Sequence, residues 1–255
     1  MIDIFIKYRY LIYYLVIRDI KKKYKRSALG ILWSMLNPLL MMLITAMVFS
    51  QLFKFEIKNF PLYLLTGQIM LNFYSEATNN SMKAILDNSA LLKKVYVPQY
   101  MFPVASAVSS CVNLILSLPA IVIIMWYTGE YPSIEVLSFM IPLLGLLLFC
   151  MGIGLILSSL AVFFRDTMHL YGVVLTALNY ATPIFYPETI IPDSYKFILI
   201  LNPLYYYLKD FRQVLYMGSL PDVNNTIICY GIGIITLVIG CVIFQKTHNK
   251  FILYI

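Results

Sequence analysis

Charged residues are scarce in this sequence, and their scarcity excludes a water-soluble globular protein. Only 12% of the 255 residues are charged, whereas 61% are hydrophobic and the mean hydropathy is +0.80. A soluble domain carries roughly 25% charged residues, which supply most of the surface that water solvates. The sequence therefore predicts a protein that exposes much of its surface to lipid.

Recognisable catalytic and nucleotide-binding motifs are also missing. The sequence has no GxxxxGK[ST] phosphate loop, no HExxH motif and no nucleophile elbow, and its two histidines, His169 and His248, lie far apart. The four cysteines stand singly within apolar runs, a pattern that predicts inert buried thiols. We therefore expect no catalytic residue, no metal and no cofactor bound by this chain.

Six long apolar runs make up most of the chain. They cover residues 31–53, 60–82, 101–127, 136–164, 167–187 and 223–245. At a rise of about 1.5 Å per residue, runs of this length cross a hydrocarbon core of roughly 30 Å. The second run is the least apolar, because Glu76 and residues 78–81 lie in its later half. The sequence predicts an all-α polytopic membrane protein, with six transmembrane helices in a single transmembrane domain over residues 1–255.

The basic residues predict how these helices are oriented. Residues 18–26 hold a dense basic cluster directly before the first span, and most of the 19 lysines and arginines fall on the side of the two termini. Because basic loops stay in the cytoplasm, we expect both termini to be cytoplasmic, in the cytoplasmic membrane of a bacterium or archaeon. The net charge of +7 suits anionic lipid headgroups, and we expect no nucleic acid partner.

Three segments outside the spans have distinct characters. Residues 1–20, within a basic segment over 1–30, predict an amphipathic helix on the cytoplasmic surface, or else an ordinary lead-in to the first span. Residues 84–98 predict a short cytoplasmic helix capped by Asn88 or Ser89. Residues 188–222 contain an apolar stretch that is too short to cross, and we predict a re-entrant outer hairpin there that turns near residues 202–203.

Four blocks of sequence resemble the membrane subunit of type-2 ABC exporters, in the branch that moves lipid-linked polysaccharides. The blocks are RDIKKKYKRSALGILWSMLNPLL (18–40), LLKKVYVP (91–98), FFRDTMHLYGVVLTALNYATPIFYP (163–187) and LNPLYYYLKDFRQVLY (201–216). The resemblance covers essentially the whole chain. It implies a homodimer with six transmembrane helices per subunit and two copies of a separate ATP-binding subunit, which binds the ATP and Mg.

The substrate that the resemblance implies is a polyprenyl-pyrophosphate-linked polysaccharide such as O-antigen, capsule or teichoic acid. Two alternatives stay open. One is export of a drug or small lipid by a transporter of the same type. The other is a membrane-embedded acyl or glycosyl transferase, although the sequence shows no cluster of acidic residues or histidines for such chemistry.

Aromatic residues near the outer end of the fifth span are the leading candidates for a sugar pathway, because sugars stack their apolar faces on aromatic rings. The predicted pathway residues are Tyr180, Phe185, Tyr186, Trp33 and Glu76. We expect Tyr180 and Phe185 to face the pathway between two subunits, with the fifth helix beside the first. An aromatic belt at headgroup depth is the alternative.

Two further groups of candidates lie outside the spans. The predicted outer gate consists of Pro203, Tyr205, Tyr206, Tyr207 and Arg212, where the arginine either attracts a pyrophosphate or anionic polymer or extends to the interface. The predicted contact with the ATPase consists of Leu91, Leu92, Lys93, Lys94, Val95, Arg165 and Asp166. A plain topological stop with a helix cap is the alternative for Arg165 and Asp166.

Overall fold

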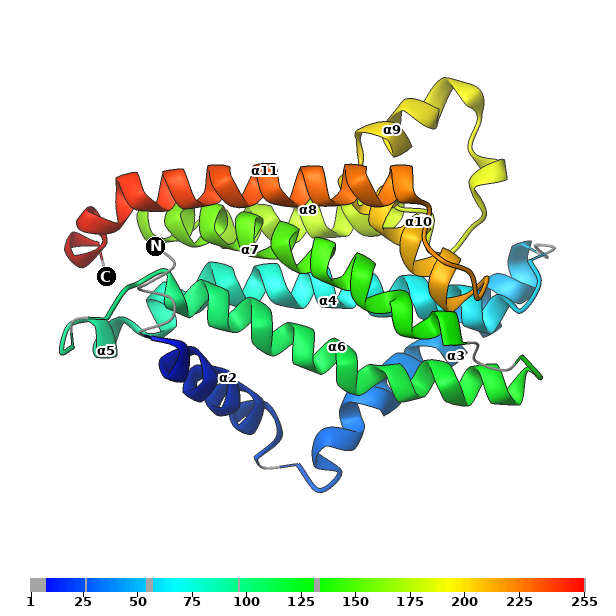
Figure 1. Ribbon diagram of the computed structural model, residues 1–255, viewed down its shortest axis with the longest axis horizontal. Helices are drawn as coiled ribbons and strands as arrows, with labels where there is room; N and C mark the ends of the chain where they lie inside the picture. Colours follow the sequence, from blue (N-terminus) through cyan, green and yellow to red (C-terminus); the bar gives the residue numbers. More distant parts are fainter. Residues whose placement is uncertain (1–7, 26, 54–56, 96, 131–133, 255) are drawn as a thin grey trace.

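The computed structural model describes residues 8–25, 27–53, 57–95, 97–130 and 134–254, and within these ranges the protein is a helical bundle without strands. Its helices are α2 (Arg9–Tyr24), α3 (Trp33–Phe53), α4 (Phe60–Asp87), α5 (Ser89–Leu92), α6 (Met101–Tyr127), α7 (Met140–Phe163), α8 (Thr167–Ala181), α9 (Lys196–Leu201), α10 (Pro203–Leu215) and α11 (Val223–Thr247). Short 3-10 turns precede α3, α7 and α9 and follow α11. The long helices α4, α6, α7 and α11 run side by side (Figure 1). The all-α fold is therefore confirmed.

Four helical segments are long and apolar enough to span a membrane: Gly30–Phe49, Met101–Tyr127, Ile134–Phe163 and Val223–Phe251. They match the first, third, fourth and sixth predicted spans. The second predicted span is α4, whose 28 residues are long enough but carry many polar side chains. The chain is thus a multi-pass membrane protein, whereas its exact number of spans and its orientation stay predictions.

The fifth predicted span is shorter than expected. Its helix, α8, has 15 residues and ends at Ala181, well before the predicted end at residue 187. Thr182 has extended backbone angles of −92° and 129°, and Pro183 follows it. The helical backbone conformation is disfavoured for a residue that precedes proline, because the proline ring clashes with the backbone of that residue. The local sequence therefore ends this helix, and the segment after it folds back against α4.

The tightest helix contact joins α7 and α11. A Cβ atom added at Gly152 would lie 2.5 Å from backbone atoms of Thr236 and Leu237, and one at Gly240 would lie 2.5 Å from the carbonyl oxygen of Gly152. Only glycine permits two helix backbones to approach this closely, as at small-residue interfaces in membranes. The pair α7–α11 forms a scaffold with no room for larger side chains at these positions.

One end of the bundle gathers segments from opposite ends of the chain. Ile12, Leu15 and Val16 of α2 pack with residues of α4, α5, α6 and α11 in one buried cluster, which also includes Phe251. Figure 1 shows α2, α5 and the carboxyl end of α11 at this end of the molecule. A helix thus forms from Arg9 to Tyr24, its position on the membrane surface stays a prediction, and residues 1–7 of that prediction lie outside the described residues.

The segment predicted to form an outer hairpin contains two helices that meet at the predicted turn. α9 ends at Leu201, and α10 begins at Pro203. The side chain of Asn202 caps α10 by accepting a hydrogen bond from the backbone N–H of Leu204 at 3.0 Å, and proline suits the first helical position. Figure 1 shows α9 projecting away from the bundle, whereas α10 packs against α4, α7 and α11. The re-entrant depth and gating role of the hairpin stay predictions.

Candidate functional site: a polar pocket between three helices

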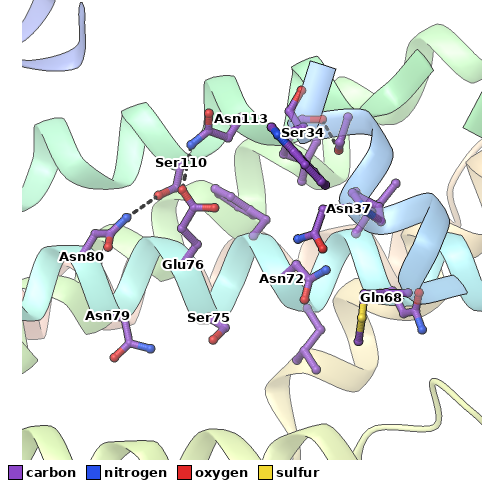
Figure 2. Close-up of a pocket in the computed structure, with 18 of the residues that line it drawn as sticks. Ser34, Asn37, Gln68, Asn72, Ser75, Glu76, Asn79, Asn80, Ser110 and Asn113 are labelled. Atoms are coloured by element: carbon purple, nitrogen blue, oxygen red, sulfur yellow. Dashed lines mark hydrogen bonds between the residues drawn. The ribbon is translucent and has the colours of Figure 1, made fainter. Parts of the chain in front are cut away.

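A polar pocket of about 830 Å³ lies between α3, α4 and α6 and is closed on another side by the end of α8. We call it the polar pocket. Figure 2 shows its amide, hydroxyl and carboxylate side chains, with those of α4 opposite those of α3 and α6. The labelled members are Ser34, Asn37, Gln68, Asn72, Ser75, Glu76, Asn79, Asn80, Ser110 and Asn113. So many polar side chains in an apolar bundle indicate a site for water or a polar ligand.

The polar residues of α4 form a continuous stripe along the helix. Gln68, Asn72, Ser75 with Glu76, Asn79 with Asn80, and Lys83 recur every three or four residues, so they share one face. The opposite face is buried among apolar side chains of α6 and α7. The weak hydrophobicity of the second predicted span is therefore the mark of a two-faced helix. The regular spacing of Gln68 and the asparagines was the signal that our sequence analysis missed.

Several carboxamides in the polar pocket are unengaged. Four asparagine side chains that line the polar pocket make no hydrogen bond within the described part of the chain: Asn37, Asn72, Asn79 and Asn179. A carboxamide offers two donors and one acceptor, and it costs free energy when it is removed from water without partners. These groups must therefore face water or the hydroxyl groups of a ligand.

Gln68 adds a buried acceptor to the wall. Its Nε2 donates to Oγ1 of Thr45 at 3.0 Å, which joins α4 to α3. Its Oε1 is buried and has no partner within the described residues, and the whole side chain is 8% exposed. An unmet acceptor beside a pocket favours a ligand that brings a donor, because a buried acceptor without a partner is destabilising.

Glu76 is the acidic residue of the polar pocket and is held by its neighbours. Lys23 Nζ of α2 lies 2.8 and 2.9 Å from its two carboxylate oxygens, and Asn113 Nδ2 donates to Oε1 at 2.7 Å. Tyr24 in turn donates to Oδ1 of Asn113 at 3.3 Å. This network joins α2, α4 and α6 at one end of the polar pocket.

The structure brings three of the five predicted pathway residues together. Trp33, Glu76 and Phe185 all line the polar pocket, whereas Tyr180 and Tyr186 do not. The Tyr180 side chain is 65% exposed, and the Tyr186 hydroxyl donates to the Tyr180 carbonyl oxygen at 2.6 Å. The role of these residues in transport stays a prediction.

The expected pairing of the first and fifth helices is not observed. α3 packs against α4 and α6, while α8 packs against α4 and α7. The nearest link is the segment after α8, where Phe185 stacks on Phe49 with ring centroids 5.3 Å apart. The polar pocket separates the two helices, because α4 turns its polar stripe toward the space between them.

Two of the predicted gate residues lie in the protein interior. Tyr207 is fully buried, stacks on Phe149 and donates to the carbonyl oxygen of Cys229 at 2.7 Å. Arg212 is 6% exposed, so it neither extends to the interface nor faces open solvent as expected. Burial of Tyr207 and Arg212 follows from α10, whose inner face packs against α4 and α7.

Arg212 instead fastens the hairpin to the bundle. Its guanidinium carbon lies 3.5 Å above the centre of the Tyr63 ring, and its Nη2 donates to the carbonyl oxygen of Ile184 at 3.2 Å. Burial lowers the pKa of Arg212 to about 10, so the side chain stays charged at neutral pH. A buried cation of this kind needs the aromatic face and the carbonyl to replace its lost hydration.

The other gate residues are more accessible. The Tyr205 hydroxyl donates to Oε2 of Glu188 at 2.8 Å, and the Tyr206 hydroxyl donates to the carbonyl oxygen of Ile200 at 3.1 Å. Pro203 is partly exposed at the start of α10. These contacts tie α10 to α9 and to the segment before it.

The residues predicted to contact an ATPase are mostly exposed. Around α5, the side chains of Leu91, Lys93, Lys94 and Val95 are exposed, whereas Leu92 is buried in the cluster that holds α2. The structure thus presents one face of this segment to solvent and anchors the other.

At the turn between α7 and α8, Arg165 and Asp166 are exposed. Asp166 occupies the position that caps α8, but its side chain makes no capping hydrogen bond. No ion pair joins Arg165 and Asp166 among the described residues.

Polar side chains that gather inside a polytopic helical bundle suit a membrane transport protein. The model of the ABC-2 type transporter family matches residues 10–216, so the chain belongs to that family.

Curated relatives match over nearly the whole chain. An O-antigen export system permease protein RfbA of Myxococcus xanthus is 31% identical over 247 residues, which cover 96% of this chain and 95% of that protein. A protein of the same name from Klebsiella pneumoniae is 31% identical over 92% of this chain and 90% of its own length. A polysialic acid transport protein KpsM of Escherichia coli is 25% identical over 92% of each chain.

Proposed function

We propose that this chain is the permease subunit of an ATP-driven exporter that moves a lipid-linked polysaccharide across the cytoplasmic membrane. The observation that carries the proposal is the polar pocket, whose unengaged carboxamides suit the many hydroxyl groups of a sugar chain. The names of the relatives, which export O-antigen or transport polysialic acid, support the same substrate class.

Weak and repeated contacts are what a moving polymer requires. Neutral carboxamide and hydroxyl groups each contribute a modest net free energy, and they exchange partners as successive sugars pass. Trp33 and Phe185 add aromatic faces to the same wall. Export of an apolar drug is less well supported, because such a ligand would leave the carboxamides of Asn72 and Asn79 without partners.

The energy source is a separate subunit that binds ATP and Mg, present in two copies on a homodimer of this chain. The exposed face around α5 suits contact with that subunit, since Leu91 and Val95 are apolar and accessible beside Lys93 and Lys94. Both termini lie on the same cytoplasmic side in this proposal. A transferase is less well supported, because the family match and the names of the relatives indicate transport.

The test is complementation of a bacterial strain that lacks its own polysaccharide export permease. The strain receives the gene for this chain together with a gene for the partner ATPase. Surface polysaccharide is then measured by immunoblot and divided by the amount of assembled complex. We expect surface polymer to return, together with co-purification of the ATPase. Assembled complex without any surface polymer in hosts that make O-antigen, capsule or teichoic acid would refute the proposal.

A cysteine at Leu91 or Val95 tests the coupling contact. Each is expected to crosslink to the ATPase subunit in a manner that depends on ATP, while a cysteine at the buried Leu92 serves as the matched control. Absence of crosslinks at every exposed position of residues 89–95 would remove this segment from the interface.

A further inference from the structure

Two pockets of this protein adjoin at one ion pair. Beside the polar pocket lies a second space of about 690 Å³ between α2, α4 and α6, which we call the vestibule. Four residues line both spaces: Lys23, Glu76, Asn80 and Asn113. Side chains at this boundary therefore decide whether the vestibule and the polar pocket are separate or continuous.

The Lys23–Glu76 pair closes the boundary from two sides. Lys23 reaches from α2 to both carboxylate oxygens of Glu76 on α4, at 2.8 and 2.9 Å. Asn113 of α6 donates to the same carboxylate at 2.7 Å, and Figure 2 shows this contact beside Asn80 and Ser110. Three helices thus meet at one carboxylate.

The pair is built to open without unfolding its surroundings. Its side chains are 43% and 30% exposed, and ion pairs with that much access to water contribute little to stability. α2 is anchored independently by Ile12, Leu15 and Val16, which are buried in the apolar cluster at the end of the bundle. Breaking the pair therefore removes one of two ties at the carboxyl end of α2, where Tyr24 also donates to Asn113, while the amino-terminal half of the helix stays packed.

The lining of the vestibule carries both signs of charge: three cations of α2 that an anionic group would bind, and the carboxylates of Asp19, Glu76 and Asp87. Arg18, Lys22 and Lys23 of α2 line it, and Lys83 lines the polar pocket next to it. Lys22 and Lys83 make no ion pair within the described residues, whereas Asp19 holds Arg18. A phosphate group carries more charge and more acceptor oxygens than the carboxylate of Glu76, so it competes well for a lysine.

We propose that the Lys23–Glu76 pair is a gate between the vestibule and the polar pocket, and that a phosphate or diphosphate group in the vestibule opens it by binding Lys23 in place of Glu76. The passage that results runs from the basic face of α2 to the amides of α3 and α4. The identity of the cargo rests on the proposed function, but the gate itself does not.

Access to Asn72 measures the gate directly, because Asn72 lines the polar pocket and not the vestibule. The full chain carries Asn72→Cys with the four native cysteines replaced by alanine. A membrane-impermeant thiol reagent is applied to vesicles from the side where α2 lies. We expect Glu76→Gln and Lys23→Met each to speed labelling at least fivefold, and the exchanged pair Lys23→Glu with Glu76→Lys to restore slow labelling.

Lys21→Gln is the matched control, since Lys21 is a neighbouring cation of α2 that lines neither space. It is expected to leave the labelling rate unchanged. Equal rates in the parent and in both single variants would overturn the gate. Fast labelling that persists in the exchanged pair would also overturn it, because it would show that altered packing of α2, and not loss of the pair, exposes Asn72.

The second arm identifies the opening group. In phosphatidylcholine vesicles, inorganic diphosphate is expected to speed labelling of the parent protein but not of Lys23→Met, whereas sodium chloride of equal ionic strength has no such effect. Acceleration by dissolved diphosphate assigns the site to a water-borne group. Acceleration only when phosphatidic acid is added to the vesicles assigns it to a lipid headgroup.

No acceleration by either phosphate source would overturn the role of phosphate. Because labelling does not depend on export, a chain that fails to restore polysaccharide export but shows the expected labelling would refute the proposed function alone. Normal export, together with a labelling rate that does not change when the Lys23–Glu76 pair is broken, would refute the gate alone.

Discussion

The two sides of the bundle are packed in opposite ways. Where α7 meets α11, backbone contacts backbone, and a Cβ added at Gly152 or Gly240 would come within 2.5 Å of the other helix. Where α3 meets α4 and α6, the helices leave a pocket of about 830 Å³ lined by polar side chains. The first contact is shaped for one arrangement only, whereas the second has space and groups that still require partners. The contact of α7 with α11, which we call the seam, fixes one side of the bundle, while the other side keeps space lined by polar groups.

The largest effect is expected at the seam. Gly152→Ala forces a methyl group against the backbone of Thr236 and Leu237, and overpacking of this kind costs about 2 kcal/mol. We expect a lower midpoint of thermal unfolding in detergent and less assembled protein. Gly172→Ala and Gly231→Ala are matched controls, because a Cβ at either position meets no atom within 4 Å. A stable Gly152→Ala protein would show that the seam is less rigid than its geometry indicates.

The next effect is expected where the hairpin joins the bundle. Arg212→Met removes the cation from the Tyr63 ring and leaves the Ile184 carbonyl unpaired, which should cost about 2 kcal/mol. Tyr63→Phe keeps the ring and loses only hydrogen bonds to the carbonyl oxygens of Pro183 and Tyr186, so a cost of about 1 kcal/mol is expected. Thermal unfolding of the purified protein measures both.

The Arg212 variant also decides between two roles for this residue. A fastening role predicts that stability falls and that export per folded complex changes little. If Arg212→Met leaves the unfolding midpoint unchanged but abolishes export, the arginine contacts an anionic substrate, as the sequence suggested, and the buried arrangement is not its working state.

A smaller effect is expected in the polar pocket. Asn72→Leu removes one unengaged carboxamide, and a net hydrogen bond is worth about 1 kcal/mol, so export per assembled complex should fall about fivefold. Stability should not fall, because the side chain of Asn72 makes no hydrogen bond within the described residues. Asn72→Gln, which keeps the carboxamide, should export more than Asn72→Leu. Equal export by the two variants would remove Asn72 from the substrate pathway.

The smallest effect is expected at Tyr180. Its side chain is largely exposed and lies outside the polar pocket, and the bond from Tyr186 reaches its backbone carbonyl, which Tyr180→Ala keeps. We expect a less than twofold change in normalised export. A loss larger than that of Asn72→Leu would restore the aromatic outer end of α8 as the main contact for the sugar chain.

Local sequence was sufficient wherever a short stretch controls its own conformation. Asn202 and Pro203 break and restart a helix by themselves, and both the turn and its position were predicted. Thr182 before Pro183 ends α8 by the same kind of local restriction, although we placed the end of the span too late. The polar stripe of α4 was equally local, and the three- and four-residue spacing of its amides was available to find it.

Contacts between distant parts of the chain could not be predicted from the sequence. Nothing local to Arg212 indicates that Tyr63 will lie beneath it, and nothing in the basic cluster indicates that Lys23 alone reaches Glu76. We expected the fifth helix to lie beside the first, but the facing direction of α4 separates them.

The sequence by itself determined that this protein is a helical membrane protein, because a low share of charge and long apolar runs leave few other stable arrangements for backbone hydrogen bonds in lipid. Local signals in the sequence also determined where two helices are interrupted, at residues 202–203 and at residues 182–183. Only the tertiary structure decided that the polar residues of α3, α4 and α6 converge on one pocket and that a lysine of α2 closes one end of it. These outcomes depend on the rotation of each helix about its axis, which is set by packing against neighbours such as the glycine seam of α7 and α11.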